Sequence, residues 1–232
     1  MGTLMFWRDY AVRRFVEVAR RLNRLKTPMD VVLETAELYG FPSQHFVALD
    51  VFARMGLINT RDFAPRCDVL ECWEIDPEIL PWLRRFVPRA TVREGDSIVA
   101  TREHRHSRDH YDLVVVDNPP SPFGVNYCEH FDHFPEILDY AGPRCILAFN
   151  FVPDLGRTPQ GRAGGSSALL EPWQERRRAF YGSPGDGVVV PLERARNTYR
   201  AMMEGRGLRV VEDTLVPRNA FVALWGFFLE RV

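Results

Sequence analysis

The segment from Phe46 to Pro77 constrains the fold more than any other part of the chain. It begins with the short apolar run Phe46 to Val51, of the kind that a parallel strand buried on both faces requires. Gly56 lies in the turn that follows, where the missing Cβ lets the backbone approach a ligand. After a short helix, a second strand from Asp68 to Trp73 ends on Glu74. The pattern predicts a parallel α/β unit that binds a ligand at the carboxyl ends of its strands.

Five further strand-like runs follow, and helix-like segments separate most of them. The strands are expected at Ala90 to Arg93, Tyr111 to Val116, Arg144 to Phe151, Leu208 to Thr214 and Ala220 to Arg231. The helices are expected at Arg8 to Lys26, Pro28 to Tyr39, Asp76 to Phe86, Glu129 to Tyr140 and Leu192 to Glu204. This alternation predicts an α/β fold with one seven-stranded, mostly parallel sheet, helices on both faces, and a C-terminal antiparallel hairpin at one edge.

The length of 232 residues, of which 46% are hydrophobic, fits a single domain. We expect an N-terminal helical cap over residues 1–44 and the main domain over residues 45–232. Residues 153–187 interrupt the alternation and leave the carboxyl end of the fifth strand, so they are expected to form a lid-like insertion over the ligand. Within it, a short helix from Leu169 to Tyr181 carries the run Arg176 to Arg178, and such a run is usually a solvated face.

Composition limits the partners and the compartment. The net charge of −1 and the pI of about 6.6 provide no overall positive field, so nucleic acid is neither implied nor excluded. The four cysteines form no CxxC pair and are expected to be reduced thiols. The apolar N-terminus is broken by Arg8 and Asp9, and no later run approaches the roughly 18 apolar residues of a membrane span. We therefore expect a cytoplasmic protein with no membrane partner.

Four short motifs resemble those of the class I S-adenosylmethionine-dependent methyltransferases. Asp50, Phe52, Ala53 and Gly56 resemble the glycine-rich first motif, and Glu74 resembles the acidic residue that binds the ribose hydroxyls. The resemblance covers about residues 46–232 and implies a Rossmann-like fold with S-adenosyl-L-methionine as cofactor. The cofactor-binding residues that it implies are Asp50, Phe52, Gly56, Glu74, Ile75, Asp96 and Ser97, the last two beside the adenine.

The stretch Asp117, Asn118, Pro119, Pro120 resembles the fourth motif of N-methyltransferases. An amine that donates hydrogen bonds to Asn118 Oδ1 and to the Pro119 carbonyl would keep its lone pair available for the methyl group. In this function the prolines fix the chain so that a carbonyl faces the pocket. The alternative is that Asn-Pro-Pro only terminates a strand, which is common. We therefore expect Asp117, Asn118 and Pro119 to be catalytic, with a nitrogen of a small or nucleoside-like molecule as acceptor.

Two positions depart from the family pattern. Arg54 replaces the first glycine of the turn, where its guanidinium could instead pair with the carboxylate of the cofactor. Ser121 stands where base methyltransferases carry an aromatic residue that stacks on the target base, although Phe123 is close by.

The histidines form two groups in the sequence. Cys128, His130 and Asp132 do not share one face of a helix, so no metal site is expected there, whereas His130 is a candidate general base and so is His133. His104, His106 and His110 lie in a polar stretch with three arginines, which favours a solvated loop.

Two alternative functions remain open from the sequence. Residues 117–138 also resemble the corresponding region of polyamine aminopropyltransferases, in which Asp117 would bind an amine. The second alternative is a non-catalytic protein of the same fold, which Arg54 in the glycine turn keeps open. Nothing in the sequence indicates the oligomeric state.

Overall fold

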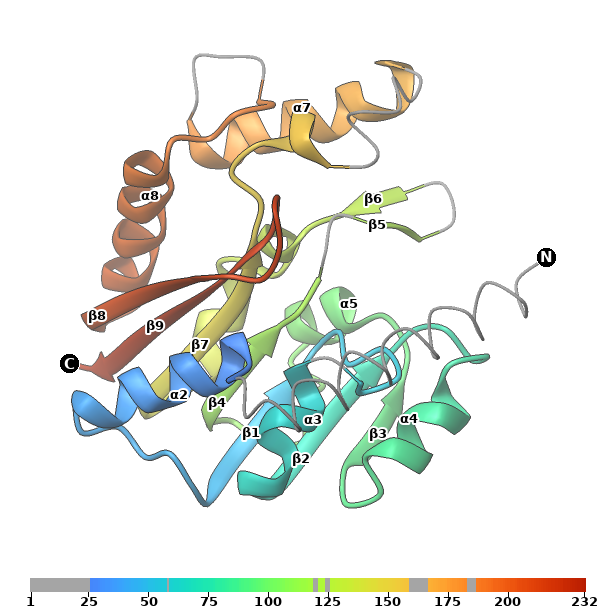
Figure 1. Cartoon of the computed structure of the whole chain (residues 1–232), viewed down its shortest axis with the longest axis vertical. Coiled ribbons are helices and arrows are strands. Elements are labelled where there is room, and N and C mark those ends of the chain that lie inside the picture. Colours follow the sequence, from blue (N-terminus) through green and yellow to red (C-terminus); the bar gives the residue numbers. More distant parts are fainter. Residues whose placement is uncertain (1–25, 58, 119–120, 124–125, 159–166, 183–186) are drawn as a thin grey trace.

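A computed structural model describes residues 26–57, 59–118, 121–123, 126–158, 167–182 and 187–232 (Figure 1). The described strands form a seven-stranded sheet in the order β3-β2-β1-β4-β7-β9-β8, with a separate two-stranded sheet β5-β6. The strands of the large sheet are β1 (Phe46–Asp50), β2 (Cys67–Glu74), β3 (Thr91–Glu94), β4 (Tyr111–Val116), β7 (Ala141–Phe151), β8 (Leu208–Pro217) and β9 (Ala223–Arg231). All seven predicted strands are therefore confirmed.

The pairing of the strands also follows the prediction. Strands β1 to β4 and β7 are parallel, whereas β9 runs antiparallel to both β7 and β8. The sheet is thus mostly parallel with an antiparallel C-terminal hairpin at one edge, as the α/β pattern indicates.

Alternate residues of each central strand point to opposite faces of the sheet, and both faces are covered. On one face, α2 (Pro28–Leu38), α3 (Asn59–Phe63) and α4 (Leu80–Phe86) pack through Val32, Phe63 and Leu83. The other face is covered by α5 (Ser97–Arg102), η2 (His130–His133), η3 (Glu136–Tyr140) and α8 (Leu192–Gly205). The first predicted helix, Arg8 to Lys26, lies outside the described residues except for its last residue.

The prediction of a single helix from Glu129 to Tyr140 is wrong. The segment instead forms the two short 3-10 helices η2 and η3, and Pro135 lies between them. Proline has no N–H to donate and forces the preceding residue into extended backbone, and Phe134 has ψ 146°. The sequence analysis also missed α5 and the small hairpin of β5 (Ser121–Phe123) and β6 (Asn126–Cys128).

The insertion after β7 contains the helix α7 (Ser167–Tyr181), which lies beyond the upper end of β7 in Figure 1. The prediction that the run Arg176 to Arg178 is exposed to solvent is wrong for Arg177, which is fully buried. Its Nε donates to Gly187 O at 2.9 Å, its Nη2 donates to Val152 O at 2.7 Å, and its Nη1 donates to Glu129. Trp173 Nε1 donates to the other oxygen of Glu129 at 2.7 Å. This buried ion pair holds α7 against the loop that follows β6.

Helix α2 begins at the capping box of Thr27 and Asp30 and packs across β8 and β9. The contact is close, because a Cβ added at Gly226 would lie 2.6 Å from Val32 Cγ1. A side chain at position 226 would therefore push α2 away from the sheet.

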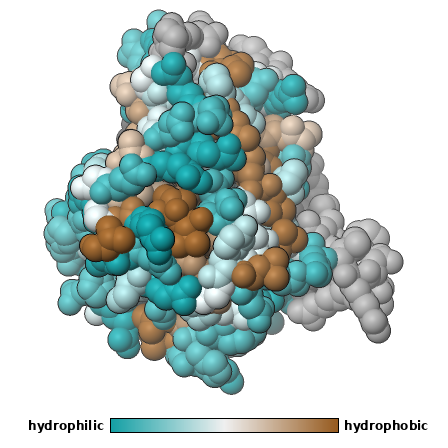
Figure 2. All heavy atoms as spheres, turned by 90° about the vertical axis from the view of Figure 1, so that its left-hand side faces the viewer, coloured by the Kyte–Doolittle hydropathy of each residue, from teal (hydrophilic) through white to brown (hydrophobic). Residues whose placement is uncertain are grey.

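Strand β8 forms an edge of the sheet, on the side of the molecule that Figure 2 shows. That side is largely hydrophilic, with smaller hydrophobic areas. Charged residues such as Arg209 and Glu212 lie along β8, which disfavours pairing of this edge with another strand. Among the described residues, no helix has the length and apolar character needed to cross a bilayer.

The Gly226→Ala variant should lower the free energy of unfolding by about 1–3 kcal/mol, because it overpacks the contact between α2 and β9. Gly205→Ala is the matched control, since nothing lies within 4 Å of a Cβ added there, and it should be neutral or slightly stabilising. Urea unfolding of both variants measures the difference. Equal stability of the two variants would contradict the close packing of α2.

The Arg177→Met variant should cost about 3–5 kcal/mol, because it leaves the buried carboxylate of Glu129 without its cation. Within the described part of the chain, the ion pair of the neighbouring Arg178 is an exposed one, at 3.8 Å from Glu175. Arg178→Met should therefore change stability by less than about 0.5 kcal/mol. Chemical denaturation of the two single variants checks this. A small effect of Arg177→Met would show that the ion pair does not anchor α7.

Candidate functional site

The carboxyl ends of four strands lie side by side and carry the predicted site residues. Val51 N donates to Val115 O of β4 at 3.1 Å, and Ala53 N donates to Trp73 O of β2 at 3.1 Å. Gly95 N in turn donates to Glu74 O at 3.0 Å. These backbone bonds bring the ends of β4, β1, β2 and β3 to one edge of the sheet, in that order.

The turn after β1 depends on two residues in left-handed conformation. Gly56 has φ +72°, and a Cβ at this position would lie 2.4 Å from Val87 Cγ2. Arg54 has φ +51° and an exposed side chain, so its guanidinium does not fill the core of the turn. The glycine that the sequence singled out is therefore required both by its backbone conformation and by the packing of α4 behind it.

Asp50 is fully buried at the end of β1. Its carboxylate accepts hydrogen bonds from Thr60 Oγ1 at 2.7 Å and from Phe52 N at 3.2 Å. Burial, together with the nearby carboxylates of Asp117 and Glu74, raises the pKa of Asp50 to about 7 against the effect of these hydrogen bonds. The charge of Asp50 is therefore sensitive to pH near neutrality and to any cation that binds at this edge.

Glu74 ends β2 and is 5% exposed. Its Oε1 accepts a hydrogen bond from Asp76 N at 2.8 Å. Burial raises the pKa of Glu74, while the charge of Arg54 opposes this shift. The next residue, Ile75, has 36% of its surface exposed, which makes it an apolar surface beside a buried carboxylate.

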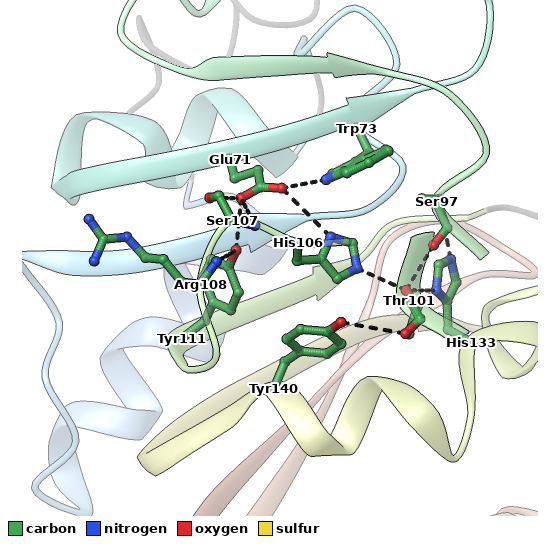
Figure 3. Close-up of polar contacts among 10 residues, drawn as sticks. All are labelled: Glu71, Trp73, Ser97, Thr101, His106, Ser107, Arg108, Tyr111, His133 and Tyr140. Atoms are coloured by element: carbon green, nitrogen blue, oxygen red, sulfur yellow. Dashed lines mark hydrogen bonds and ion pairs between the residues drawn. The ribbon is translucent and has the colours of Figure 1, made fainter. Parts of the chain in front are cut away.

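Asp96 and Ser97 follow β3. Asp96 caps α5, because its Oδ1 accepts from Ile98 N at 2.8 Å and from Val99 N at 3.3 Å. Ser97 is 4% exposed, and its Oγ lies 3.4 Å from Nε2 of His133 (Figure 3). The His133 ring also meets the Phe52 ring edge-on, with centroids 4.8 Å apart. His133 therefore connects the ends of β1 and β3.

Asp117 and Asn118 follow β4 and are 7% and 5% exposed. Asp117 Oδ1 accepts a hydrogen bond from Arg218 Nη1 at 2.6 Å and another from Asn150 Nδ2. Arg218 Nη1 also donates to Asn150 Oδ1, so the three side chains form a closed set. Arg218 and Asn150 were missed by the sequence analysis, and no local pattern marks either of them. Pro119 lies outside the described residues.

His130 is also fully buried, in an aromatic cluster rather than at this edge. Its ring stacks on Phe149 with centroids 4.8 Å apart, and its Nε2 contacts the hydroxyl of Tyr199. Burial first, and then the charge of Arg177, holds the pKa of His130 well below its usual value. This environment suits a neutral core histidine.

A buried polar network extends from Ser97 into the protein (Figure 3). Thr101 Oγ1 lies 3.0 Å from both His133 Nδ1 and His106 Nε2. His106 Nδ1 in turn lies 3.7 Å from Glu71 Oε1, and hydrogen bonds hold the pKa of Glu71 at about 2 against the effect of its burial. The expected solvated loop is thus wrong for His106, whereas His104 and His110 are exposed.

No protein-family profile matches the chain, and no curated protein matches it. Solved structures do share its fold. The magnesium protoporphyrin IX methyltransferase ChlM from Synechocystis PCC 6803, solved with bound SAH, is 12% identical with a TM-score of 0.53, over 88% of this chain and 81% of that one. A putative sarcosine dimethylglycine methyltransferase from Galdieria sulphuraria is 12% identical with a TM-score of 0.52, over 87% and 84%.

TYW2 from M. jannaschii, solved in complex with AdoMet, is 11% identical with a TM-score of 0.50, and the match covers 86% of this chain and 76% of that one. At these identities the similarity establishes the fold alone. Together with the strand order and the parallel core, it shows that this chain has the fold of the class I S-adenosylmethionine-dependent methyltransferases.

Proposed function

We propose that the protein is an S-adenosylmethionine-dependent methyltransferase that acts on a nitrogen of a small or nucleoside-like acceptor. The observation that supports this most is the order of groups along one sheet edge: the glycine turn after β1, the buried carboxylate of Glu74 after β2, and Asp96 and Ser97 after β3. This order matches the order of the parts of an adenosyl cofactor, from its amino-acid end through the ribose to the base.

The residues present fit the cofactor chemically. Glu74 offers a carboxylate to the ribose hydroxyls, and the exposed side chain of Ile75 offers an apolar surface to the base. Asp50 and Glu74 make the edge acidic, which favours the positive charges of S-adenosylmethionine. When bound, the cofactor would supply a methyl group activated by a positive sulfur.

The acceptor side consists of Asn118 and its neighbours after β4. The buried Asn118 offers a side-chain oxygen that could accept a hydrogen bond from the acceptor amine, as the motif with Pro119 suggests. We do not place His130 at the acceptor, because its ring is fully buried in the aromatic cluster.

The contact between Asp117 and Arg218 weighs against the aminopropyltransferase alternative. In that function Asp117 would bind a cationic amine, but here its Oδ1 already accepts from Arg218 at 2.6 Å. A carboxylate that is paired with a guanidinium is a poor partner for a second cation.

Calorimetry with S-adenosylhomocysteine tests the cofactor site. Glu74→Ala should weaken binding by about 1–3 kcal/mol through the loss of hydrogen bonds to the ribose. Glu37→Ala is the matched control, because this exposed residue lies in the last turn of α2, two residues before Tyr39. The backbone oxygen of Tyr39 accepts from Arg144 near the start of β7, and the carboxyl ends of the parallel strands lie at the other end of that strand. Absence of binding to the unmodified protein would favour the non-catalytic alternative, and equal binding by both variants would remove the role of Glu74.

The affinity for S-adenosylmethionine should rise by about three- to tenfold between pH 6 and pH 8. Asp50, with its pKa of about 7, is largely protonated at pH 6 and becomes negative as the pH rises, which attracts the cationic cofactor. The Asp50→Asn variant should flatten this pH dependence. An equally steep dependence in that variant would assign it to another group.

A further inference from the structure

The buried network behind Ser97 fixes where its protons lie, because each hydroxyl has only one hydrogen to donate. Thr101 Oγ1 donates that hydrogen to the backbone oxygen of Ser97, one helical turn earlier, at 2.8 Å. A carbonyl oxygen can only accept, so the hydrogen of Thr101 is committed. Any further partner of Thr101 Oγ1 must therefore be a donor.

Two imidazole nitrogens are such partners. Nδ1 of His133 and Nε2 of His106 each lie 3.0 Å from Thr101 Oγ1, so each carries the hydrogen of its contact (Figure 3). Burial, together with the charges of His106 and Arg102, lowers the pKa of His133 to about 3, so its ring is neutral. A neutral ring with the hydrogen on Nδ1 has a lone pair on Nε2.

That lone pair faces the hydroxyl of Ser97. Oγ of Ser97 lies 3.4 Å from Nε2 of His133, and only the serine can supply the hydrogen of this contact. The hydrogen of Ser97 is therefore directed toward His133, and toward any further partner the hydroxyl can only accept a hydrogen bond. The adjacent carboxylate of Asp96 is also an acceptor.

Ser97 lies where the base of an adenosyl ligand would come. Strand β3 is the neighbour of β2 on the side away from β1, and Gly95 N is bonded to Glu74 O. A nucleoside whose sugar is held by Glu74, and whose tail follows the turn after β1, extends its base toward β3. The exposed Ile75 lies next to Glu74 along this path.

We propose that His133 is a positioning residue that fixes the Ser97 hydroxyl as a hydrogen-bond acceptor, so that the end of β3 selects a purine with an exocyclic amino group over one with a carbonyl oxygen in its place. The inference rests on the proposed function, because it concerns the base of the cofactor. It assigns specificity to a side chain buried behind the residue that meets the ligand.

Calorimetry with two ligands whose bases differ at this position, and in the hydrogen that the carbonyl form carries on the neighbouring ring nitrogen, tests the proposal. S-adenosylhomocysteine carries the amino group, and S-inosylhomocysteine carries an oxygen instead. The unmodified protein should bind S-adenosylhomocysteine at least about thirtyfold more tightly than S-inosylhomocysteine. The carbonyl oxygen of the inosyl compound is an acceptor, and it would face the acceptor oxygens of Asp96 and Ser97.

Two substitutions of His133 separate its two nitrogens. His133→Asn keeps an N–H near the place of Nδ1 for Thr101 but removes the acceptor for Ser97, so the preference should fall by about fivefold or more. His133→Gln can place an amide oxygen near the position of Nε2 and should keep the preference within about twofold of the original. Ser97→Ala, which removes the hydroxyl itself, should also reduce the preference. Cooperative thermal unfolding checks that each variant is folded.

The outcomes are distinct. A reduced preference in His133→Asn and Ser97→Ala, with recovery in His133→Gln, supports the proposal. If S-adenosylhomocysteine binds but its preference over S-inosylhomocysteine is unchanged in His133→Asn and Ser97→Ala, the positioning role is wrong while the proposed function stands. If the unmodified protein binds neither ligand, the proposed function fails and this inference fails with it.

Discussion

The site depends on one feature of the sheet, namely that β1 pairs in parallel with β2 on one side and with β4 on the other. The chain leaves β1 toward β2 and β3 and later returns to the other side of β1 for β4, so the loops after β1 and β4 turn in opposite directions. In open α/β sheets such a reversal provides a place for a ligand, and it needs no special residues. The sequence determines which groups line it.

The residues that line this edge are unusually acidic for positions that are nearly inaccessible to solvent. Asp50, Glu74 and Asp117 are at most 7% exposed, and the charges of Glu74 and Asp117 both raise the pKa of Asp50. Burial of like charges destabilises the fold unless a cation compensates them. Arg218 compensates Asp117 within the protein, which leaves Asp50 and Glu74 as the carboxylates that gain most from a bound cationic ligand.

The strands could be predicted from the sequence because each is a local apolar run that must be buried, and Tyr111 to Val116 was predicted with its correct ends. Pairings between distant charges could not be predicted. Arg177 lies in a run of three arginines that looks solvated, and only its contact with Glu129, 48 residues earlier, shows otherwise. The burial of His106 could not be predicted for the same reason, because its partner Glu71 lies 35 residues earlier, in β2, and the two side chains meet only in the folded structure.

The two sides of the candidate site differ in how far they could be predicted, and the difference follows from how each is built. Asp50, Glu74 and Asp96 each end a strand or begin a helix, so short sequence patterns locate them. The acceptor side that we propose includes the contact of Asp117 with Arg218, which lies 101 residues later in the sequence, in the turn between β8 and β9. A cofactor site formed from strand ends could therefore stay the same while the distant turn that carries Arg218 changes. For this reason the residues around Arg218, rather than the motif Asp117 to Pro120 alone, are where we expect the identity of the acceptor to be determined.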